Sequence, residues 1–185
     1  MRMKDSGNLL SKKNIALTDS TKIKIEINLK KYSLTLFDGG IPLKNYRVFL
    51  GHSASKLGSL RNGFVTTPTG KYKVTSIDTS KLFYMRLVID YPNFEDIKTA
   101  YKNNFINRKE FRRLWQKLID GKQINVDEKI FGPKISIEGC GKLNYILKNL
   151  PFVFNWTNGS IAMCNEDINE LIRFVKPGTE VKIVE

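Results

Sequence analysis

The sequence predicts a mainly β domain, a mixed β-sandwich with inserted helices and a closing helix–strand unit. Apolar and polar residues alternate between Lys22 and Lys30, which is typical of a strand with one buried face. Further short apolar runs, separated by turns that contain Gly or Pro, continue to residue 90. Helical periodicity is confined to about residues 94–121 and 166–175. This pattern favours a β domain into which helices are inserted.

The first expected strand covers residues 22–30, and its apolar residues share one face: Ile23, Ile25, Ile27 and Leu29. Residues 32–37 repeat the alternation more weakly, and the Asp38-Gly39-Gly40 sequence predicts a hairpin turn after them. Further strands are expected at residues 46–51 and, after a Thr-Pro-Thr-Gly turn, at residues 71–77. The first half of the chain should therefore be an antiparallel β region.

Two helices are expected within the insertion at about residues 94–121. The first covers about residues 94–103, and the second covers about 108–120 and ends at Gly121. One face of the second helix is apolar, and the other carries Arg108, Lys109, Arg112, Arg113 and Lys117. A solvated basic face is the favoured interpretation, and a docking surface for an anionic polymer is the alternative. Nucleic acid is not expected as a partner, because the aromatic residues lie on the apolar side.

The C-terminal unit is expected to be a helix followed by a strand. Asn165 is the expected N-cap, and the next two residues are acidic, which favours the start of a helix. The helix, at about residues 166–175, should bury Ile168, Leu171, Ile172 and Val175. The remaining strands are expected at residues 83–90, 134–138 and 181–184, whereas residues 161–163 are expected only as a short apolar link.

Length and charge limit the possible classes of protein. The 185 residues are enough for one domain, expected at residues 22–185 after a flexible leader at residues 1–21. The net charge of +13 favours an anionic partner. No apolar run approaches the roughly 20 residues of a membrane span, and the leader lacks the apolar region of a signal peptide. We therefore expect either a cytoplasmic protein or one whose export signal is absent from this sequence.

The content of cysteine and histidine argues against metal and disulfide frameworks. Cys140 and Cys164 are the two cysteines, and their spacing fits no zinc motif. With His52 as the single histidine, a histidine-based metal site is not expected either. No metal or cofactor is predicted.

One stretch, residues 155–168, concentrates the features of a catalytic turn. It reads Asn-Trp-Thr-Asn-Gly-Ser-Ile-Ala-Met-Cys-Asn-Glu-Asp-Ile, so a Gly-containing turn would hold backbone N–H groups near the Ser160 hydroxyl. The stretch resembles the signature Asp-Trp-Thr-x-Gly-Cys-Ile-Ala-hydrophobic-x-Asn in one branch of the YkuD-type L,D-transpeptidases. The turn at residues 67–70, the Tyr91-Pro92-Asn93 sequence and residues 175–181 are similar to that family too. The resemblance covers residues 22–185 and implies a YkuD-like fold.

The resemblance also implies where this chain departs from the family. Ser160 stands at the position of the catalytic Cys, and Glu138, before Gly139, stands at that of the catalytic His. Thr157 and Gly159 match the motif, and with Gly139 they are the expected oxyanion-hole or substrate-binding positions. Trp156 is either a substrate platform or a core indole. These enzymes attack a peptidoglycan stem-peptide carbonyl with a thiolate that the His activates.

The substituted pair is poorly suited to that chemistry. A serine hydroxyl is far less acidic than a thiol and needs a base that is effective near neutral pH. Glu138, with a reference pKa of about 4.3, is a weak base unless burial raises that value. The sequence therefore predicts a degenerate, catalytically inactive L,D-transpeptidase-like protein. Its expected partner is a peptidoglycan stem peptide or an anionic polymer of the envelope, and the resemblance implies an envelope or periplasmic location.

Alternative interpretations remain open at this point. An active peptidoglycan L,D-transpeptidase or L,D-carboxypeptidase could use Ser160, or it could use Cys140 as nucleophile with His52 as base. Cys140 lies two residues after Glu138 and would share its face if the strand continued. A single inactivating replacement would account for Ser160 but not for Glu138. A basic, non-catalytic cytoplasmic adaptor is the third class.

Overall fold

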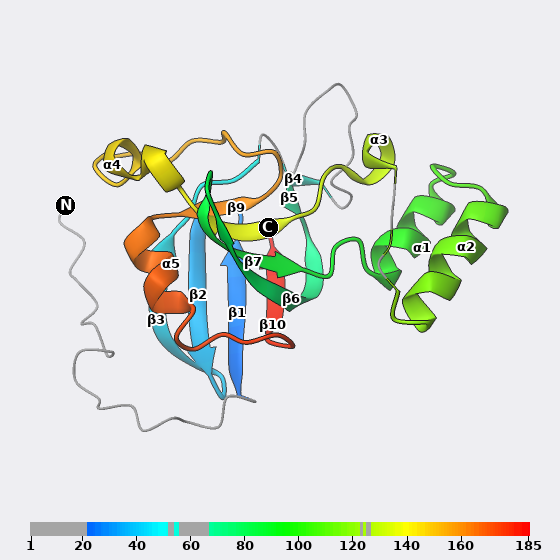
Figure 1. The fold of residues 1–185 in the computed structure, drawn as a ribbon, viewed down its shortest axis with the longest axis horizontal. Helices are drawn as coiled ribbons and strands as arrows, with labels where there is room; N and C mark the ends of the chain where they lie inside the picture. The colour runs from blue at the N-terminus through cyan, green and yellow to red at the C-terminus, as the bar shows by residue number, and fades with distance from the viewer. Residues whose placement is uncertain (1–21, 52–53, 56–66, 123, 125–126) are drawn as a thin grey trace.

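The computed structural model of the protein describes residues 22–51, 54–55, 67–122, 124 and 127–185 (Figure 1). The expected leader, residues 1–21, lies outside these ranges. Within them, eight strands form one mixed sheet in the order β3-β2-β1-β10-β6-β7-β8-β9. The pairs β1–β10 and β8–β9 are parallel, and the other neighbours described in this sheet are antiparallel. The prediction of a mainly β fold with a few helices is confirmed.

The first three strands form an antiparallel meander: β1 (Ile23–Asn28), β2 (Ser33–Asp38) and β3 (Ile41–Arg47). In the β2–β3 turn, Gly39 and Gly40 have φ values of +57° and +94°, which glycine adopts without a steric penalty. The bounds expected for the third strand, residues 46–51, are wrong, because β3 ends at Arg47. After it, Phe49 pairs with Ala162 and Gly51 with Thr157 as isolated bridges. The chain leaves the meander here to lie beside a segment that is distant in sequence.

The second half of the sheet is built on the long strand β6 (Gly70–Ser80), which pairs with β10 (Glu180–Val184) and β7 (Tyr84–Ile89). The strands β8 (Ser136–Gly139) and β9 (Ile161–Met163) complete it. The expectation of a mere apolar link at residues 161–163 is wrong, because these residues pair with β8. A separate two-stranded parallel pair consists of β4 (Ala54–Ser55) and β5 (Thr67–Pro68).

One hydrophobic core lies between the two halves of the bent sheet. In Figure 1, β7 and β8 run across the direction of β1, β2 and β10. Side chains from both halves pack in one cluster, among them Ile25, Ile183, Leu87, Ile137 and Ile161. Because side chains alternate along a strand, the opposite face of β7–β9 makes separate contacts. On that face Ala162 belongs to a smaller cluster with Phe49, Cys140 and Leu147.

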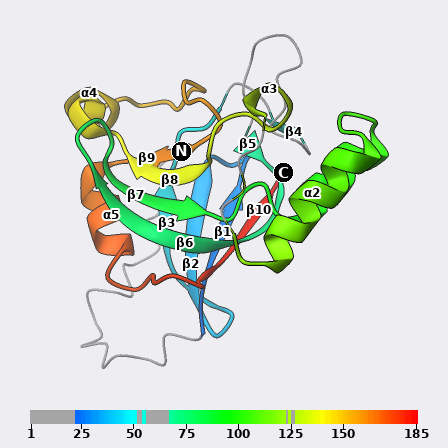
Figure 2. The same cartoon turned by 45° about the vertical axis from the view of Figure 1, so that its right-hand side comes forward.

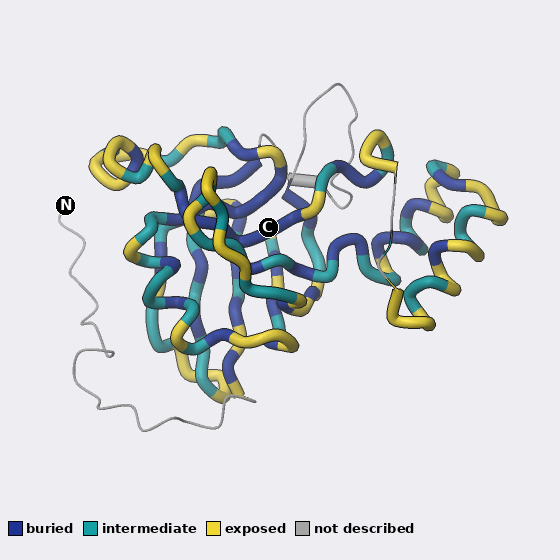
Figure 3. Tube along the Cα trace, viewed as in Figure 1, coloured by how far each residue is buried: buried dark blue, intermediate teal, exposed yellow. Residues whose placement is uncertain are grey.

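The helices α1 (Phe94–Lys102) and α2 (Arg108–Ile119) project together from the sheet (Figures 1 and 2). Leu114 of α2 is fully buried, but Ile119 is 65% exposed, so the expected apolar face is only partly covered. Figure 3 shows long exposed stretches on α2 and on the short helices. These are α3 (Glu128–Phe131), the 3₁₀ turn η2 (Gly141–Leu143) and α4 (Asn144–Leu147). Among the described residues no helix is long and apolar enough to cross a membrane.

The closing helix α5 (Asn165–Leu171) is shorter than expected, and its predicted N-cap is wrong. Cys164 is the N-cap and makes no capping hydrogen bond through its side chain. The Asn165 side chain instead contacts Gly141. Its Oδ1 accepts the Gly141 N–H (3.0 Å), and its Nδ2 donates to the Gly141 carbonyl (3.1 Å). Asn165 thereby ties α5 to the segment that follows β8. Ile168 and Leu171 are buried as the periodicity predicts.

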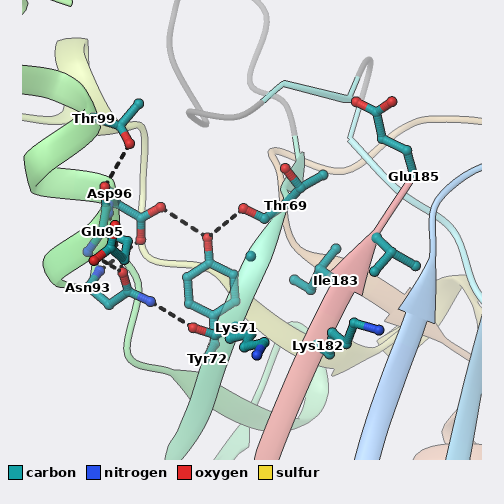
Figure 4. Close-up of a pocket in the computed structure, with 12 residues that line it drawn as sticks. Thr69, Lys71, Tyr72, Asn93, Glu95, Asp96, Thr99, Lys182, Ile183 and Glu185 are labelled. Atoms are coloured by element: carbon teal, nitrogen blue, oxygen red, sulfur yellow. Dashed lines mark hydrogen bonds between the residues drawn. The ribbon is translucent and has the colours of Figure 1, made fainter. Parts of the chain in front are cut away.

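A buried carboxyl attaches α1 to the sheet beside a pocket of about 630 Å³ (Figure 4). Asp96 is 5% exposed, and its Oδ1 lies 3.1 Å from the hydroxyl of Tyr72 on β6. That hydroxyl also lies 3.2 Å from the Thr69 carbonyl, and the Asn93 N–H donates to the second Asp96 oxygen. Burial raises the pKa of Asp96 to about 7 despite the hydrogen bonds from Asn93 and Tyr72. A protonated Asp96 would donate to Tyr72 and leave the tyrosine proton for Thr69.

We predict that Asp96 makes the fold less stable as pH rises. The folded state holds this proton up to about pH 7, whereas an unfolded Asp releases it near pH 4. The contribution of the protonated Asp96 carboxyl to the free energy of unfolding is therefore complete below about pH 4. It is lost as pH rises through 7, by at most about 4 kcal/mol. Asp96→Asn mimics the protonated carboxyl and should flatten the pH dependence of the urea midpoint in this window. The exposed Asp78→Asn is the control, and equal slopes in Asp96→Asn and wild type would contradict the prediction.

Candidate functional site

The sheet register brings the predicted catalytic positions to one face. Glu138 of β8 pairs with Arg86 of β7 on one side and with Ala162 of β9 on the other. Two residues earlier in β8, Ser136 pairs with Val88. Because β8 and β9 are parallel, Ser160, two residues before Ala162, lies level with Ser136. Ser160 and Glu138 thus share a sheet face but lie one repeat of the pleat apart.

Ser136 links the two predicted positions through hydrogen bonds. Its backbone N–H donates to the Ser160 Oγ (3.2 Å), and its own hydroxyl donates to the Glu138 Oε2 (2.7 Å). The two serine hydroxyl oxygens lie 3.3 Å apart. Since the Ser136 proton is directed to Glu138, the Ser160 hydroxyl is the donor between the serines. The result is a buried chain of polar groups from Ser160 through Ser136 to Glu138.

The sequence analysis does not single out Ser136, although a signal is present. Ser136 and Glu138 are two residues apart in an expected strand, so both side chains must leave the same face. Ser136 is fully buried, Glu138 is 5% exposed and Ser160 is 8% exposed. A serine on an otherwise apolar buried strand needs a hydrogen-bond partner, and the acidic residue two positions later supplies it.

Burial dominates the electrostatics of Glu138. Loss of solvent raises the pKa of this carboxyl, and the hydrogen bond from Ser136 and the charge of Arg86 offset only part of that effect. The Arg86 Nε lies 3.8 Å from the Glu138 Oε2, and it has no hydrogen-bond partner among the described residues. The raised pKa makes an ionised Glu138 a stronger proton acceptor than an exposed glutamate, and at a given pH a smaller fraction of it is ionised. The hydroxyl that donates to this carboxyl is Ser136, not Ser160.

The turn before Ser160 is held by Thr157. Its hydroxyl donates to the Ser160 carbonyl (2.5 Å), and its backbone N–H donates to the Leu50 carbonyl (3.1 Å). Gly159 has a φ of +89°, which favours glycine between these two residues. Thr157 is 3% exposed, so its side chain shapes the turn from inside.

Trp156 lies at the edge of the small apolar cluster rather than free in solvent. The indole is half-buried against the group that contains Phe49 and Cys140. Its Nε1 is buried without a hydrogen-bond partner among the described residues. This position fits the core interpretation of Trp156 better than an open platform.

Gly139 is confined by its neighbours. A Cβ at this position would lie 2.8 Å from both the Asn165 Oδ1 and the Phe83 carbonyl oxygen. Any side chain would therefore displace the asparagine that holds the segment after β8. The requirement for glycine at residue 139 is one of close packing.

The structural premise for Cys140 as a nucleophile is wrong. The strand ends at Gly139, and Cys140 has helical φ and ψ of −74° and −4°, so it does not continue the face of Glu138. The thiol is 3% exposed among Phe49, Leu147 and Ala162, and burial raises its pKa to about 12. Such a thiol forms little thiolate at neutral pH. His52, its predicted base, lies outside the described residues.

A pocket of about 900 Å³ reaches Arg86, although Ser136, Glu138 and Ser160 do not line it. Arg86 and Val88 line it, on the sheet face shared by Ser136 and Glu138. The opposite wall comes from the segments after α2 and before β8, including Lys122 and Lys134. In the part of the chain that the structure describes, no three His, Cys, Asp or Glu side chains lie together in an arrangement that could hold a metal ion.

Comparisons with known proteins agree with this fold. A family model described as the L,D-transpeptidase catalytic domain, YkuD, matches residues 22–183. The solved structure of Bd1075 from Bdellovibrio bacteriovorus superposes with a TM-score of 0.55 at 16% identity, covering 88% of this chain and 48% of that one. An L,D-transpeptidase from Mycobacterium tuberculosis H37Rv superposes with a TM-score of 0.52 at 12% identity, covering 89% and 58%.

A third structure, L,D-transpeptidase 3 from Mycobacterium tuberculosis, superposes with a TM-score of 0.52 at 11% identity, covering 89% of this chain and 61% of that one. This chain thus spans about half to three fifths of these proteins. At such low identity the superpositions establish the fold alone. No curated protein matches the sequence.

We predict that positions 138 and 160 can be converted into a thiolate–imidazole pair. In Ser160→Cys alone, a thiol would lie near a carboxyl, whose charge disfavours the thiolate. Adding Glu138→His should lower the thiol pKa, so iodoacetamide should modify residue 160 faster at neutral pH. The rate is measured by peptide mapping, which separates it from Cys140 and Cys164.

The matched control is Ser160→Cys with Glu138→Gln, which removes the carboxylate without adding an imidazole. A faster rate in this control would show only the loss of negative charge. If the histidine variant reacts no faster than the glutamine variant, positions 138 and 160 do not face each other, and the assignment of the site is wrong.

Proposed function

The chain belongs to the YkuD family of L,D-transpeptidase catalytic domains, and from this premise we propose that it is a non-catalytic member that binds peptidoglycan stem peptides. Ser160 and Glu138 stand, in this proposal, where the family has its catalytic Cys and His. The domain would keep the fold that presents a peptide and lack the groups that attack it. Family membership also supports a location in the cell envelope.

The observation that carries the proposal is the buried hydrogen-bonded chain of Ser160, Ser136 and Glu138. Ser136 lies between Ser160 and Glu138, and Ser136 rather than Ser160 donates to the carboxyl. An acyl-transfer base must accept a proton near the working pH and return it to the leaving group. Burial raises the pKa of Glu138 in that direction, but among the described residues the carboxyl makes no hydrogen bond with the Ser160 hydroxyl, which is itself far less acidic than a thiol.

Retention of peptide binding rests on the pocket of about 900 Å³ that Arg86 connects with this chain. Its Arg86 points one guanidinium nitrogen at Glu138 from 3.8 Å, and the side chain is still 31% exposed. A guanidinium can bind a peptide carboxylate through paired hydrogen bonds. Lys122 and Lys134 add positive charge, although Asp78, Asp90 and Glu128 line the same pocket. We assign the carboxylate of a stem peptide to Arg86.

The contacts of Ser136 favour one second candidate, acyl transfer by Ser160. The Ser160 proton would pass to the Ser136 Oγ while the Ser136 proton passed to an ionised Glu138, and the Ser160 Oγ would attack the peptide carbonyl. As the C–N bond breaks, Glu138 would return the proton through the same hydroxyl to the leaving amine. The 3.3 Å and 2.7 Å contacts permit this relay. It requires an ionised carboxyl, which burial of Glu138 disfavours. Any such activity should therefore rise with pH as Glu138 ionises.

We predict no cross-linked or trimmed product when the full chain is incubated with purified muropeptides at neutral pH. Mass spectrometry of the muropeptides is the measurement, and Ser160→Ala is the control for background. Product that forms in wild type and disappears in both Ser160→Ala and Ser136→Ala would contradict inactivity and establish the relay. Product that is lost only in Cys140→Ala would instead identify Cys140 as the nucleophile.

We predict that the protein sediments with isolated sacculi and that Arg86 contributes to this binding. Arg86→Gln should weaken retention roughly tenfold, because an interaction with a charged group is worth about 1.5–3 kcal/mol. Binding should also weaken as salt rises. Arg112→Gln removes the same charge from the exposed face of α2 and is the matched control.

Equal losses in the two arginine variants would indicate a general effect of net charge and would remove the pocket from the account. Thermal unfolding of both variants separates weaker binding from a weaker fold, because Arg86 also faces the buried Glu138.

A further inference from the structure

A protruding apolar surface surrounds α4. Six of the eleven large hydrophobic side chains exposed in the described residues belong to two segments here, the β6–β7 hairpin and residues 143–154. We call them the α4 surface: Leu82 (73% exposed), Leu143 (45%), Tyr145 (78%), Ile146 (57%), Phe152 (58%) and Phe154 (39%). Exposed apolar residues scattered singly need no explanation, but a group of this kind marks an interaction site.

The two segments that form the α4 surface are in direct contact. Leu82 lies in the β6–β7 hairpin, and Figures 1 and 2 both place this hairpin beside α4. Gly141 packs so closely on it that a Cβ would lie 1.9 Å from the Leu82 carbonyl oxygen. The clamp from Asn165 to Gly141 holds the same junction (3.0 and 3.1 Å). The hairpin and the segment that follows β8 are therefore held together where the exposed residues begin.

The exposed phenylalanines of the α4 surface are connected to the interior by ring contacts. Phe49 is fully buried, and its ring meets that of Phe154 edge-on at 6.0 Å. The Phe154 ring in turn lies 6.2 Å from that of Phe152. These contacts hold the outer phenylalanines at the surface.

The burial of one face of α4 determines which of its residues point outward. Leu147 is buried in the small cluster, and Tyr145, two residues earlier, lies about 200° around the helix from it. The Arg47 guanidinium donates to the carbonyls of Leu147 (3.0 Å) and Leu150 (2.7 Å), which holds the end of the helix. Tyr145 and its neighbour Ile146 consequently point away from the domain.

Lysine predominates around the α4 surface, where Glu166 of α5 is an acidic neighbour that contacts Asn144 (2.9 Å) and Lys148. Residues 79–84 and 140–160 contain three lysines, Lys81, Lys142 and Lys148, and no acidic residue. Lys148 is paired with Glu166 (3.4 Å), whereas Lys81 and Lys142 are exposed. The whole chain carries a net charge of +13. Aliphatic and aromatic side chains bordered by lysine are the combination that binds an anionic lipid surface.

We propose that the α4 surface inserts into the headgroup region of an anionic lipid bilayer. The apolar side chains would be buried at the boundary of the acyl chains, and Lys81 and Lys142 would contact lipid phosphates. Leucine and isoleucine at this surface favour lipid over a glycan strand, which would require hydrogen-bonding groups there. The domain would then lie on a membrane while its Arg86 pocket remained free. This binding is independent of the function proposed for that pocket.

The test is co-sedimentation of the full chain with sucrose-loaded vesicles at low ionic strength. Vesicles of phosphatidylglycerol and phosphatidylcholine should retain the protein, and vesicles of phosphatidylcholine alone should retain much less. The double variant Ile146→Ser with Phe152→Ser should bind at least roughly tenfold more weakly, because two inserted side chains are lost. Ile41→Ser with Ile119→Ser is the matched control, since these residues are 66% and 65% exposed elsewhere.

A second double variant tests the charge. Lys81→Gln with Lys142→Gln should weaken binding to the anionic vesicles roughly fivefold per lysine and leave the weak binding to phosphatidylcholine unchanged. Insertion is measured independently by the fluorescence of the Tyr145→Trp variant. On binding to vesicles, emission from the introduced tryptophan should shift to shorter wavelength and be quenched by brominated lipid.

Three results would overturn the proposal. The first is no retention by anionic vesicles, and the second is an equal loss in the Ile41/Ile119 control. The third is sedimentation velocity that reveals a dimer in wild type and a monomer in Ile146→Ser with Phe152→Ser, without vesicle binding. That result would assign the surface to a second copy of the chain. Arg86→Gln should leave vesicle binding intact, so failure of the peptide-binding proposal is distinguishable.

Discussion

The parallel pairing of β8 with β9 is the constraint on which the site depends. It sets Ser136 level with Ser160 and Glu138 level with Ala162, and it directs these side chains away from the main core. The bridges from Phe49 to Ala162 and from Gly51 to Thr157 close the other side. A one-residue slip of β9 would turn Ser160 into the core and expose Ile161, so the hydrophobic pattern itself protects the register.

The polar groups at this junction are satisfied by one another, and this has a chemical consequence. Ser136 supplies an N–H to Ser160 and an O–H to Glu138, so a carboxyl and a hydroxyl can be buried here at modest cost. The same burial raises the pKa of Glu138, which makes its carboxylate a stronger proton acceptor, but the hydrogen bond from Ser136 places another hydroxyl between this carboxyl and Ser160. The group that stabilises the buried carboxyl thus separates it from the predicted nucleophile. Arg86, half in the site and half in the neighbouring pocket, is the group through which the site could still recognise a ligand.

Much of this arrangement follows from local sequence rules. The alternation in β1, the Gly39-Gly40 turn and the helical periods of α1 and α2 are properties of short windows, and each predicts its element. The three residues of β9 have no period of their own and are strand only because β8 lies beside them. The use of Asn165 as a clamp on Gly141 and the link through Ser136 likewise depend on residues more than 20 positions away. Burial of Cys140 follows from the end of β8 at Gly139, which strand periodicity alone does not predict.

The central claim is that the domain holds a peptide at the Arg86 pocket without being acylated by it at Ser160. Intact-mass spectrometry of the full chain during incubation with a tetrapeptide muropeptide tests this directly, because it detects an acyl-protein whether or not product is released. The account predicts an unchanged protein mass from neutral to mildly alkaline pH, under conditions in which binding to the same muropeptide is measured by calorimetry. A covalent peptide adduct mapped to Ser160, and absent from Ser160→Ala, would contradict it.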